Sequence, residues 1–251
     1  MSREVVLETR DIWKRFGGII ALRNINIKVF KGELLGIIGP NGSGKTTLFN
    51  IITGFLKPDK GRIILSGEDV TGFSPHEMVK RGVVRTFQLV KPFMGMNVLD
   101  NIRVALYMRH GLMSRVSERE IIGEAREILK MIGLSHREDV SADSLSHGEK
   151  KKLEIGRALA LKPKILLLDE PTGGLTTAEI DDIIRLIKDI HENGTTVVVV
   201  EHNMRVIMNL SERLIALNSG VVIAEGDPKD VVSNPEVVKA YLGERFAVKS
   251  R

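Results

Sequence analysis

Short apolar runs along the chain alternate with longer segments of helical periodicity. The run 34–38 (LLGII) is too short for a membrane span and stops at a glycine, which is typical of a buried strand. The runs inside 164–171 (KILLLDEP) and 195–202 (TTVVVVEH) have the same character. Continuous apolar strands separated by helical segments predict a parallel sheet of the α/β class. A helix should follow the first run, because apolar residues recur there at helical spacing, at Leu48, Ile51, Ile52 and Phe55.

The segment 4–30 shows the two-residue period of β-strands instead. Apolar side chains at Ile25, Ile27 and Val29 alternate with polar ones at Asn24, Asn26 and Lys28. A further strand is predicted in 62–69, a short helix in 75–82, and a strand in 82–88 (GVVRTFQ) that ends at Gln88.

From Asn97 to Leu161 the period becomes helical. Two apolar stripes carry this prediction, one formed by Ile121, Ala125, Ile128, Leu129 and Ile132 and the other by Leu153, Gly156, Leu159 and Ala160. We therefore expect one domain, 1–251, with a core lobe (1–90 and 163–251) and an inserted helical lobe (91–162). A helix from about Thr176 to Glu192, two β runs in 213–226 and a tail helix in 235–246 complete the core lobe.

The residues after the first buried strand fit a phosphate-binding loop. Gly39 to Thr46 match G-x-x-x-x-G-K-[ST] between a strand and a helix. Glycines at such positions let several backbone N–H groups surround one anion at a helix N-terminus. Lys45 would reach the β- and γ-phosphates, and the Thr46 hydroxyl would ligate Mg²⁺. A nucleotide triphosphate is the expected ligand.

Carboxylates follow a second buried strand. Asp169 and Glu170 come directly after 165–168, and ligands of open α/β sheets lie beyond the carboxyl ends of strands. Asp169 would hold Mg²⁺ through its hydration shell, and Glu170 would orient the attacking water. His202 follows the strand in 195–202 and would contact the γ-phosphate.

The segment 145–161 begins with a helix-capping pattern. Ser146 and Glu149 have the spacing of a capping box, with Gly148 in the first turn. A helix N-terminus with a hydroxyl and a glycine is also an anion site, so the same amides could serve both purposes.

Composition adds little to this picture. A net charge of +5 and a pI near 9.4 are compatible with nucleic acid, an anionic membrane surface or simple solubility. Only 4% of the residues are aromatic, so stacking on single-stranded nucleic acid has little support. Zero cysteines exclude disulfides and thiolate chemistry. We expect a cytoplasmic protein, because neither a signal peptide nor a membrane span is visible.

Five motifs together resemble one family. GPNGSGKTT (39–47), Gln88, LSHGE (145–149), LLLDEPT (166–172) and His202 occur in the order of an ABC-type ATPase, the nucleotide-binding subunit of ABC transporters. The resemblance implies a P-loop NTPase (RecA-like) core with an N-terminal antiparallel β subdomain and an inserted helical subdomain. It also implies a dimer that encloses each ATP between the phosphate loop of one subunit and the 145–149 stretch of the other.

The resemblance assigns roles to single residues. Phe16 would stack on adenine, Gln88 would sense Mg²⁺, the attacking water and the permease, and Glu170 would be the catalytic base, with His202 on the γ-phosphate. The remaining ATP contacts would come from two stretches of the chain, which are Gly39, Pro40, Asn41, Gly42, Ser43, Gly44, Lys45, Thr46 and Thr47, and Ser146, His147, Gly148 and Glu149.

Three residues depart from the commonest family pattern. His147 and Glu149 replace a glycine and a glutamine of LSGGQ, while Ser146 and Gly148 remain. Thr176 replaces the aspartate of the S-A-L-D loop, which puts coupling across the dimer through that position in doubt.

Within the family, the stretches 82–102 and 234–244 are similar to the ATPases of branched-chain amino-acid importers. Such subunits pair with two membrane permeases and, indirectly, an external solute-binding protein, and they lie on the inner face of the cell membrane. Urea or amide importers and the lipopolysaccharide-export ATPase share much of the pattern. The working dimer could hold two copies of this chain or one copy and a sibling ATPase.

Two alternative functions have less support from the sequence than a transporter ATPase. A soluble ABC ATPase of translation or DNA maintenance usually has two fused nucleotide domains or a long coiled coil, which this chain lacks, so we expect no nucleic-acid partner. An unrelated P-loop kinase would not explain LSHGE or His202.

The sequence assigns no role in the nucleotide site to two groups of residues. Phe93, Met94, Met96 and Val98 either dock a permease or pack the helical lobe against the sheet. The lysines 150–152 are expected to form a solvated helix face.

Overall fold

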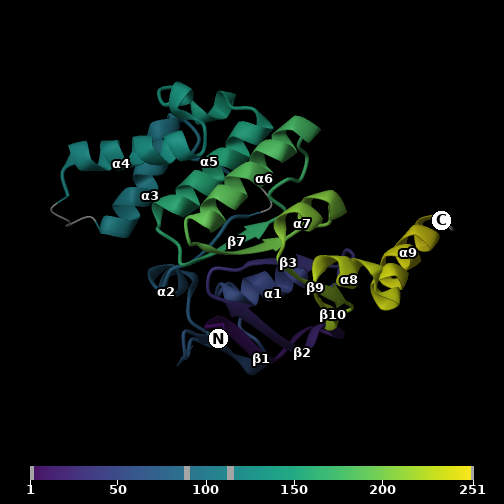
Figure 1. Ribbon diagram of the computed structural model, residues 1–251. Coiled ribbons are helices and arrows are strands. Elements are labelled where there is room, and N and C mark those ends of the chain that lie inside the picture. The colour runs from purple at the N-terminus through teal and green to yellow at the C-terminus, as the bar shows by residue number, and fades with distance from the viewer. Residues whose placement is uncertain (1–2, 88–90, 112–115, 250–251) are drawn as a thin grey trace.

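The strands in the described part of the chain form two sheets (Figure 1). A computed structural model describes residues 3–87, 91–111 and 116–249. One sheet has four strands in the order β2-β1-β4-β5, and the other has six in the order β10-β9-β3-β8-β7-β6. The strands are β1 (Val5–Phe16), β2 (Ile19–Phe30), β3 (Leu34–Ile38), β4 (Lys60–Leu65), β5 (Glu68–Asp69), β6 (Val83–Arg85), β7 (Ile165–Asp169), β8 (Thr196–Val200), β9 (Arg213–Asn218) and β10 (Val221–Gly226).

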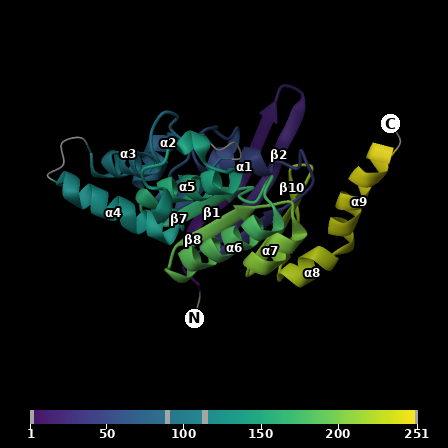
Figure 2. The same ribbon diagram turned by 90° about the horizontal axis from the view of Figure 1, so that it is seen from above.

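Helices cover the six-stranded sheet on both faces. In Figure 1, α5, α6 and α7 lie on one side of it, and α1 with the four-stranded sheet lies on the other. The α-helices are α1 (Lys45–Ile52), α2 (Pro75–Lys80), α3 (Val98–His110), α4 (Glu118–Met131), α5 (His147–Ala160), α6 (Thr177–Glu192), α7 (Met204–Leu210), α8 (Pro228–Ser233) and α9 (Pro235–Lys249). The C-terminal α8 and α9 lie at the opposite end of the molecule from α3 and α4 (Figure 2).

The expected parallel sheet is present. β3 pairs in parallel with β8 and β9, and β7 pairs in parallel with β8 and β6. β10 is antiparallel to β9, and the pairings of β1, β2, β4 and β5 are all antiparallel. Because parallel strands end at the same edge, the residues that follow β3, β7 and β8 are brought to one side of the sheet.

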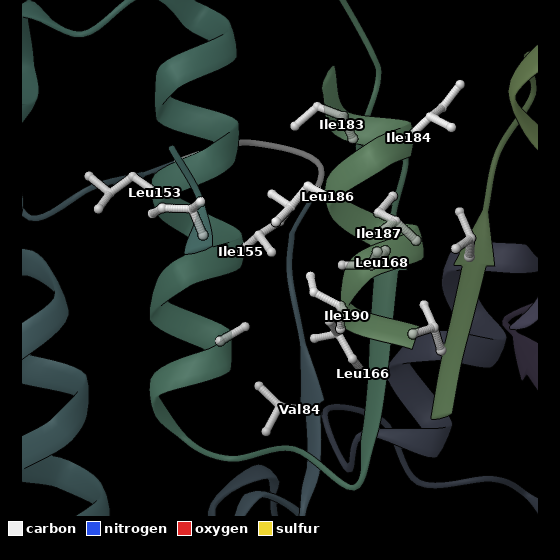
Figure 3. Packing of buried hydrophobic residues seen from close by; sticks show 14 of the residues in the cluster. Val84, Leu153, Ile155, Leu166, Leu168, Ile183, Ile184, Leu186, Ile187 and Ile190 are labelled. Carbon is white, nitrogen blue, oxygen red and sulfur yellow. The ribbon is translucent and has the colours of Figure 1, made fainter. Parts of the chain in front are cut away.

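The buried strands divide their side chains between two hydrophobic clusters. Leu34 and Ile38 belong to the cluster under α5 and α6, whereas Leu35 and Ile37 belong to the cluster around α1 and the four-stranded sheet. This two-residue alternation is the geometry of a strand covered on both faces. Figure 3 shows the first cluster, where side chains of α5 and α6 meet over Leu166 and Leu168 of β7.

The helices α3, α4 and α5 come between β6 and β7 in the chain. Both apolar stripes predicted for this region face inward, with Ile121, Leu129 and Leu153 fully buried. Gly156 allows the close approach, since a Cβ there would lie 2.6 Å from the Ile132 side chain and 3.0 Å from that of Ile102. The helices share one core with the sheet, because their apolar residues belong to the same cluster as β7 and β8.

Three predicted boundaries were wrong. The single strand predicted in 62–69 is two strands, because Ser66 and Gly67 take φ values of +49° and +87° and turn the chain between β4 and β5. α1 ends at Ile52 because Thr53 caps it and Gly54 takes a φ of +77°, so Phe55 lies outside the helix. β6 ends at Arg85 and does not extend toward Gln88. Thr86 still donates its N–H to Leu167 O, but the Phe87 N–H turns to the Glu154 carboxylate and the chain leaves the sheet. Gln88 itself lies outside the described residues.

None of the helices in the described part of the chain combines the length and apolar character that a membrane span needs.

Candidate nucleotide site

The predicted phosphate loop joins β3 to α1. Gly42 and Gly44 have φ values of +76° and +106°, which L side chains rarely adopt. Position 39 has no room for a side chain, because a Cβ there would clash with Leu217 O at 2.2 Å and with the Ser43 hydroxyl at 2.6 Å. Backbone conformation and close packing therefore explain the three glycines of the motif.

Lys45 folds back over its own loop. Its Nζ donates to Gly39 O at 2.7 Å and to Pro40 O at 2.9 Å, and the side chain is buried. Thr46 is exposed and Thr47 half-buried at the start of α1, while Asn41 is exposed on the loop. Lys45 thus lies inside the loop that would surround the phosphates.

Asp169 ends β7 and is held by an arginine. Arg85 Nη2 donates to Asp169 Oδ2 at 2.6 Å, and the two side chains are 4% and 3% exposed. Arg85 Nη1 also donates to Asn50 Oδ1 of α1 at 2.6 Å. Asp169 is therefore linked through Arg85 to the helix that follows the phosphate loop.

Glu170 and His202, which follow the neighbouring strands β7 and β8, lie close together. Glu170 follows β7 with a φ of +47°, and its N–H donates to Val200 O of the neighbouring strand. Glu170 Oε1 lies 3.6 Å from His202 Nδ1. The strand order β3-β8-β7 brings this pair and the phosphate loop to the same edge of the sheet.

Glu201 is a buried residue of the site that the sequence analysis missed. It has no exposed surface, and its Oε1 accepts from the Thr172 N–H at 3.0 Å and the Thr172 hydroxyl at 2.6 Å. Its other oxygen accepts from the His202 N–H at 3.2 Å. Glu201 therefore ties the loop after β7 to the loop after β8. A charged residue directly after an apolar strand was the available signal.

The capping box at the start of α5 is confirmed. Ser146 Oγ accepts from the Glu149 N–H at 3.1 Å, and Glu149 Oε2 accepts from the Ser146 N–H at 2.8 Å. His147 is exposed and its Nε2 lies 3.1 Å from Gly173 O. This stretch therefore contacts the loop after β7 in its own chain.

The lysine run in α5 is not a uniformly solvated face, and that prediction was wrong for Lys151. The Lys151 side chain is buried, and its Nζ donates to Glu170 O at 3.2 Å. Burial lowers the pKa of this ammonium, although nearby carboxylates oppose the shift. Lys152 pairs with Asp182, and Lys150 donates to Asp143 O. Helical geometry explains the difference, since adjacent residues point about 100° apart.

Phe16 lies at the tip of the β1–β2 hairpin. The residue is 47% exposed, and Lys14 Nζ lies 5.7 Å from the centre of its ring. The same hairpin reaches the phosphate loop, because a Cβ at Gly44 would lie 2.8 Å from Ala21 O of β2. An exposed aromatic ring at the tip of a hairpin that packs against the phosphate loop fits the predicted contact with adenine.

The apolar residues that follow β6 are partly buried and partly exposed. Val98 is fully buried in the core, so it belongs to the packing alternative. Phe93, Met94 and Met96 are exposed, and Arg157 lies over the Phe93 ring at 4.1 Å. Beside them is a groove of about 450 Å³ between β6 and the helices, lined by Phe87, Phe93, Met108, Glu154 and Arg157 among others. Burial raises the pKa of Glu154 within this groove.

The residues present fit Mg²⁺. This ion prefers oxygen ligands, keeps several waters and is usually bound through one or two protein oxygens together with phosphates. Thr46 supplies a hydroxyl at the start of α1, and Asp169 supplies a carboxylate whose Oδ2 is already oriented by Arg85.

Comparison with known families identifies two matching regions. Residues 22–173 match the family described as "ABC transporter". Residues 221–247 match the family described as "Branched-chain amino acid ATP-binding cassette transporter".

Two relatives are similar in sequence over almost the whole chain. The high-affinity branched-chain amino acid transport ATP-binding protein BraF of Pseudomonas aeruginosa is 41% identical, over 97% of this chain and 100% of its own length. The high-affinity branched-chain amino acid transport ATP-binding protein LivG of Escherichia coli is 38% identical, and the match covers 95% of this chain and 98% of LivG.

Solved structures give the same result for the fold. The ADP conformation of MJ1267, an ATP-binding cassette of an ABC transporter, has a TM-score of 0.86 and 38% identity, and the match covers 95% of this chain and 99% of that one. The cbiO1 protein of Clostridium perfringens has a TM-score of 0.83 at 26% identity. The expected α/β P-loop NTPase fold is confirmed. The chain belongs to the ABC transporter family and is an ATP-binding ATPase that powers transport.

Proposed function

We propose that this chain energises the import of branched-chain amino acids, or similar polar solutes, through two partner membrane permeases. The observation that supports this most strongly is the match of 221–247 to a branched-chain-specific C-terminal segment, in addition to the general family match. The relatives named for branched-chain amino acid transport match 95–97% of the chain. The protein would lie on the inner face of the cell membrane, where the permeases receive solute from an external binding protein.

The nucleotide site would work through groups that converge at one edge of the sheet. Phe16 would stack on adenine, and the loop amides with Lys45 would bind the phosphates. Mg²⁺, bound with ATP, would neutralise phosphate charge beside Thr46 and Asp169. Lys45 Nζ donates to the carbonyls of Gly39 and Pro40, which holds the ammonium inside the loop where it would meet the phosphates.

Glu170 would orient and activate the attacking water. Its position next to the phosphate-loop edge and its distance of 3.6 Å from His202 suit this role, with His202 on the γ-phosphate. Lys151 and Glu201 would act as positioning residues, because Lys151 binds the Glu170 carbonyl oxygen and Glu201 binds the Thr172 N–H two residues later. Gln88 keeps its proposed role toward Mg²⁺, water and the permease on the basis of the resemblance alone.

The site is completed by a second ATPase subunit in this proposal. Ser146 to Glu149 would meet ATP bound to the partner, which is a second copy or a sibling. ATP would then close the dimer by binding the closed state more tightly than the open one. The groove beside Phe93 and Met108 would receive a permease, because its exposed aromatic and methionine side chains suit an adaptable contact.

Glu170→Gln tests the catalytic assignment. The variant should lose ATP turnover by a factor on the order of 10³ and accumulate an ATP-bound dimer, since the amide cannot act as a base. Glu192→Gln, at the exposed end of α6, is the matched control and should turn over ATP normally. Equal turnover in Glu170→Gln would contradict the assignment.

Purification from native membranes in mild detergent tests the transport assignment. We expect two polytopic permeases, a second ATPase subunit and an amino-acid-binding protein to accompany the tagged chain. Recovery of lipopolysaccharide-export components would contradict import. Recovery with ribosomes or DNA alone would contradict a role in transport.

A further inference from the structure

A carboxylate occupies the N-terminus of α5 in this structure. The Glu179 carboxylate, on the third residue of α6, packs against Gly148 in the first turn of α5. The two groups are in close contact, because a Cβ added at Gly148 would lie 2.5 Å from Glu179 Oε1 and 2.9 Å from its Cδ. Gly148 itself is buried.

The other oxygen of Glu179 is used locally. Glu179 Oε2 accepts from the Thr176 N–H at 2.9 Å and from the Thr176 hydroxyl at 2.8 Å, which forms the capping box of α6. These bonds fix the carboxylate, and they lower the pKa of Glu179. The side chain is therefore held as an anion between two helix N-termini.

A second contact joins the same two segments. His147 Nε2 lies 3.1 Å from Gly173 O, and a Cβ at Gly174 would lie 3.2 Å from the same nitrogen. His147 and Thr176, which both depart from the commonest family pattern, thus lie on the two sides of one junction. The residues 146–149 and 173–179 form one junction, in which His147 contacts the loop after β7 and Thr176 caps α6.

We propose that Glu179 is an internal substitute for the γ-phosphate, which occupies the Gly148 amide until ATP on the partner subunit displaces it. Phosphate and carboxylate are both attracted to the free N–H groups and the dipole of a helix N-terminus. Two anions at one amide repel each other, so the dimer can close fully only when the Glu179 carboxylate leaves Gly148. This inference rests on the proposed function, because it needs the ATP-closed dimer.

The test compares two hydrolysis-deficient proteins, Glu170→Gln and Glu170→Gln with Glu179→Gln. Glutamine keeps the capping-box spacing of α6 but removes the charge that competes with phosphate. The measurement is the ATP concentration at half-maximal dimer, followed by light scattering on the full-length chains. We expect Glu179→Gln to lower this concentration by a factor on the order of five, the low end of ordinary coupling between sites.

Controls separate charge from helix capping. Ser117→Ala in the Glu170→Gln protein weakens the equivalent capping box of α4 and leaves Glu179 and its partners intact, so it should not change the midpoint. Glu192→Gln removes a charge from the other end of α6 and should also leave the midpoint unchanged. The effect of Glu179→Gln should shrink at high salt, where charges near the surface are screened.

The outcomes distinguish the two levels of the proposal. An unchanged or higher midpoint in Glu179→Gln, with normal dimers in the parent protein, would reduce Glu179 to a helix cap and overturn the inference alone. Failure of the Glu170→Gln parent to dimerise at any ATP concentration would overturn the proposed function, and the inference with it.

Discussion

Arg85 and Asp169 form a buried ion pair that joins the last strand of the sheet to its phosphate-binding edge. Their contact of 2.6 Å is almost fully shielded from water, and Arg85 also donates to Asn50 of α1. The position of the proposed Mg²⁺-binding carboxylate is thus fixed by a residue three positions before Gln88. A shift of the segment around Arg85 would be transmitted directly to Asp169.

Replacing Arg85 with methionine should destabilise the protein strongly. The change leaves the Asp169 carboxylate buried without its partner, so we expect the free energy of unfolding in urea to fall by about 3 kcal/mol. Arg62→Met is the matched control, because that arginine is exposed and 3.8 Å from Asp69, and it should change stability by less than about 0.5 kcal/mol. Equal losses in the two variants would show that the buried pair has no special role.

Tyr241 connects the branched-chain-specific C-terminal segment to the phosphate loop. The Gly39 N–H donates to the Tyr241 hydroxyl at 2.8 Å, and Gly39 O accepts from Lys45. Tyr241→Phe removes the acceptor, so the free energy of unfolding should fall by about 1 kcal/mol. The affinity for ADP, measured by calorimetry, should also fall because the loop is less well held.

Tyr107→Phe, which removes an exposed hydroxyl 3.3 Å from Arg103, is the control and should leave ADP binding unchanged. Unaltered ADP affinity in Tyr241→Phe would separate α9 from the nucleotide site.

Phe16→Ala should weaken ATP binding without destabilising the fold, since the ring is already half-exposed. Loss of stacking on a base costs roughly 1 to 3 kcal/mol, which corresponds to a loss of affinity of about tenfold or more. Binding of inorganic tripolyphosphate, which has no base, should not change. Ile19→Ala, at the opposite side of the same hairpin tip, is the control. A parallel loss of ATP and tripolyphosphate binding would indicate a damaged phosphate loop instead.

Glu124 should make the free energy of unfolding depend on pH in the acidic range. Its hydrogen bond from Arg109, of 2.5 Å, is the main cause that lowers the pKa of Glu124 from 4.5 to about 2. A carboxyl with a lowered pKa in the folded state stabilises the fold above pH 4.5 and loses that contribution as the pH falls toward 2. After a discount for partial exposure, Glu124→Gln should cost about 1 to 2 kcal/mol at pH 7. The difference from the parent protein should disappear near pH 2. Glu127→Gln on the same helix is the control, and a pH-independent difference in Glu124→Gln would contradict the ionic origin.

The sequence carried enough local information to predict the strand at 34–38, the helix from Thr176 to Glu192, and the capping box of Ser146 and Glu149. Each of these depends on contacts between residues close in the chain, or on a periodicity that repeats over several turns. The convergence of Glu170 and His202 was also predictable, because the ends of neighbouring parallel strands share one edge.

Other parts of the site depend on contacts between distant segments. Lys151 stands in a run of three lysines, and only its place on α5 under the loop after β7 shows that it is buried. Arg85 meets a carboxylate 84 residues away, and Glu179 meets Gly148 across two helix termini. Periodicity fixes the face of a helix on which a residue lies, but it does not show which segment covers that face.

Uptake of labelled branched-chain amino acids by cells that lack their own copy of this chain tests the central claim most directly. The chain returned on a plasmid should restore uptake of leucine, isoleucine and valine, and Glu170→Gln should not. Uptake that is unaffected by the loss of the chain, or restored equally by Glu170→Gln, would contradict a role in which ATP hydrolysis at this site drives import.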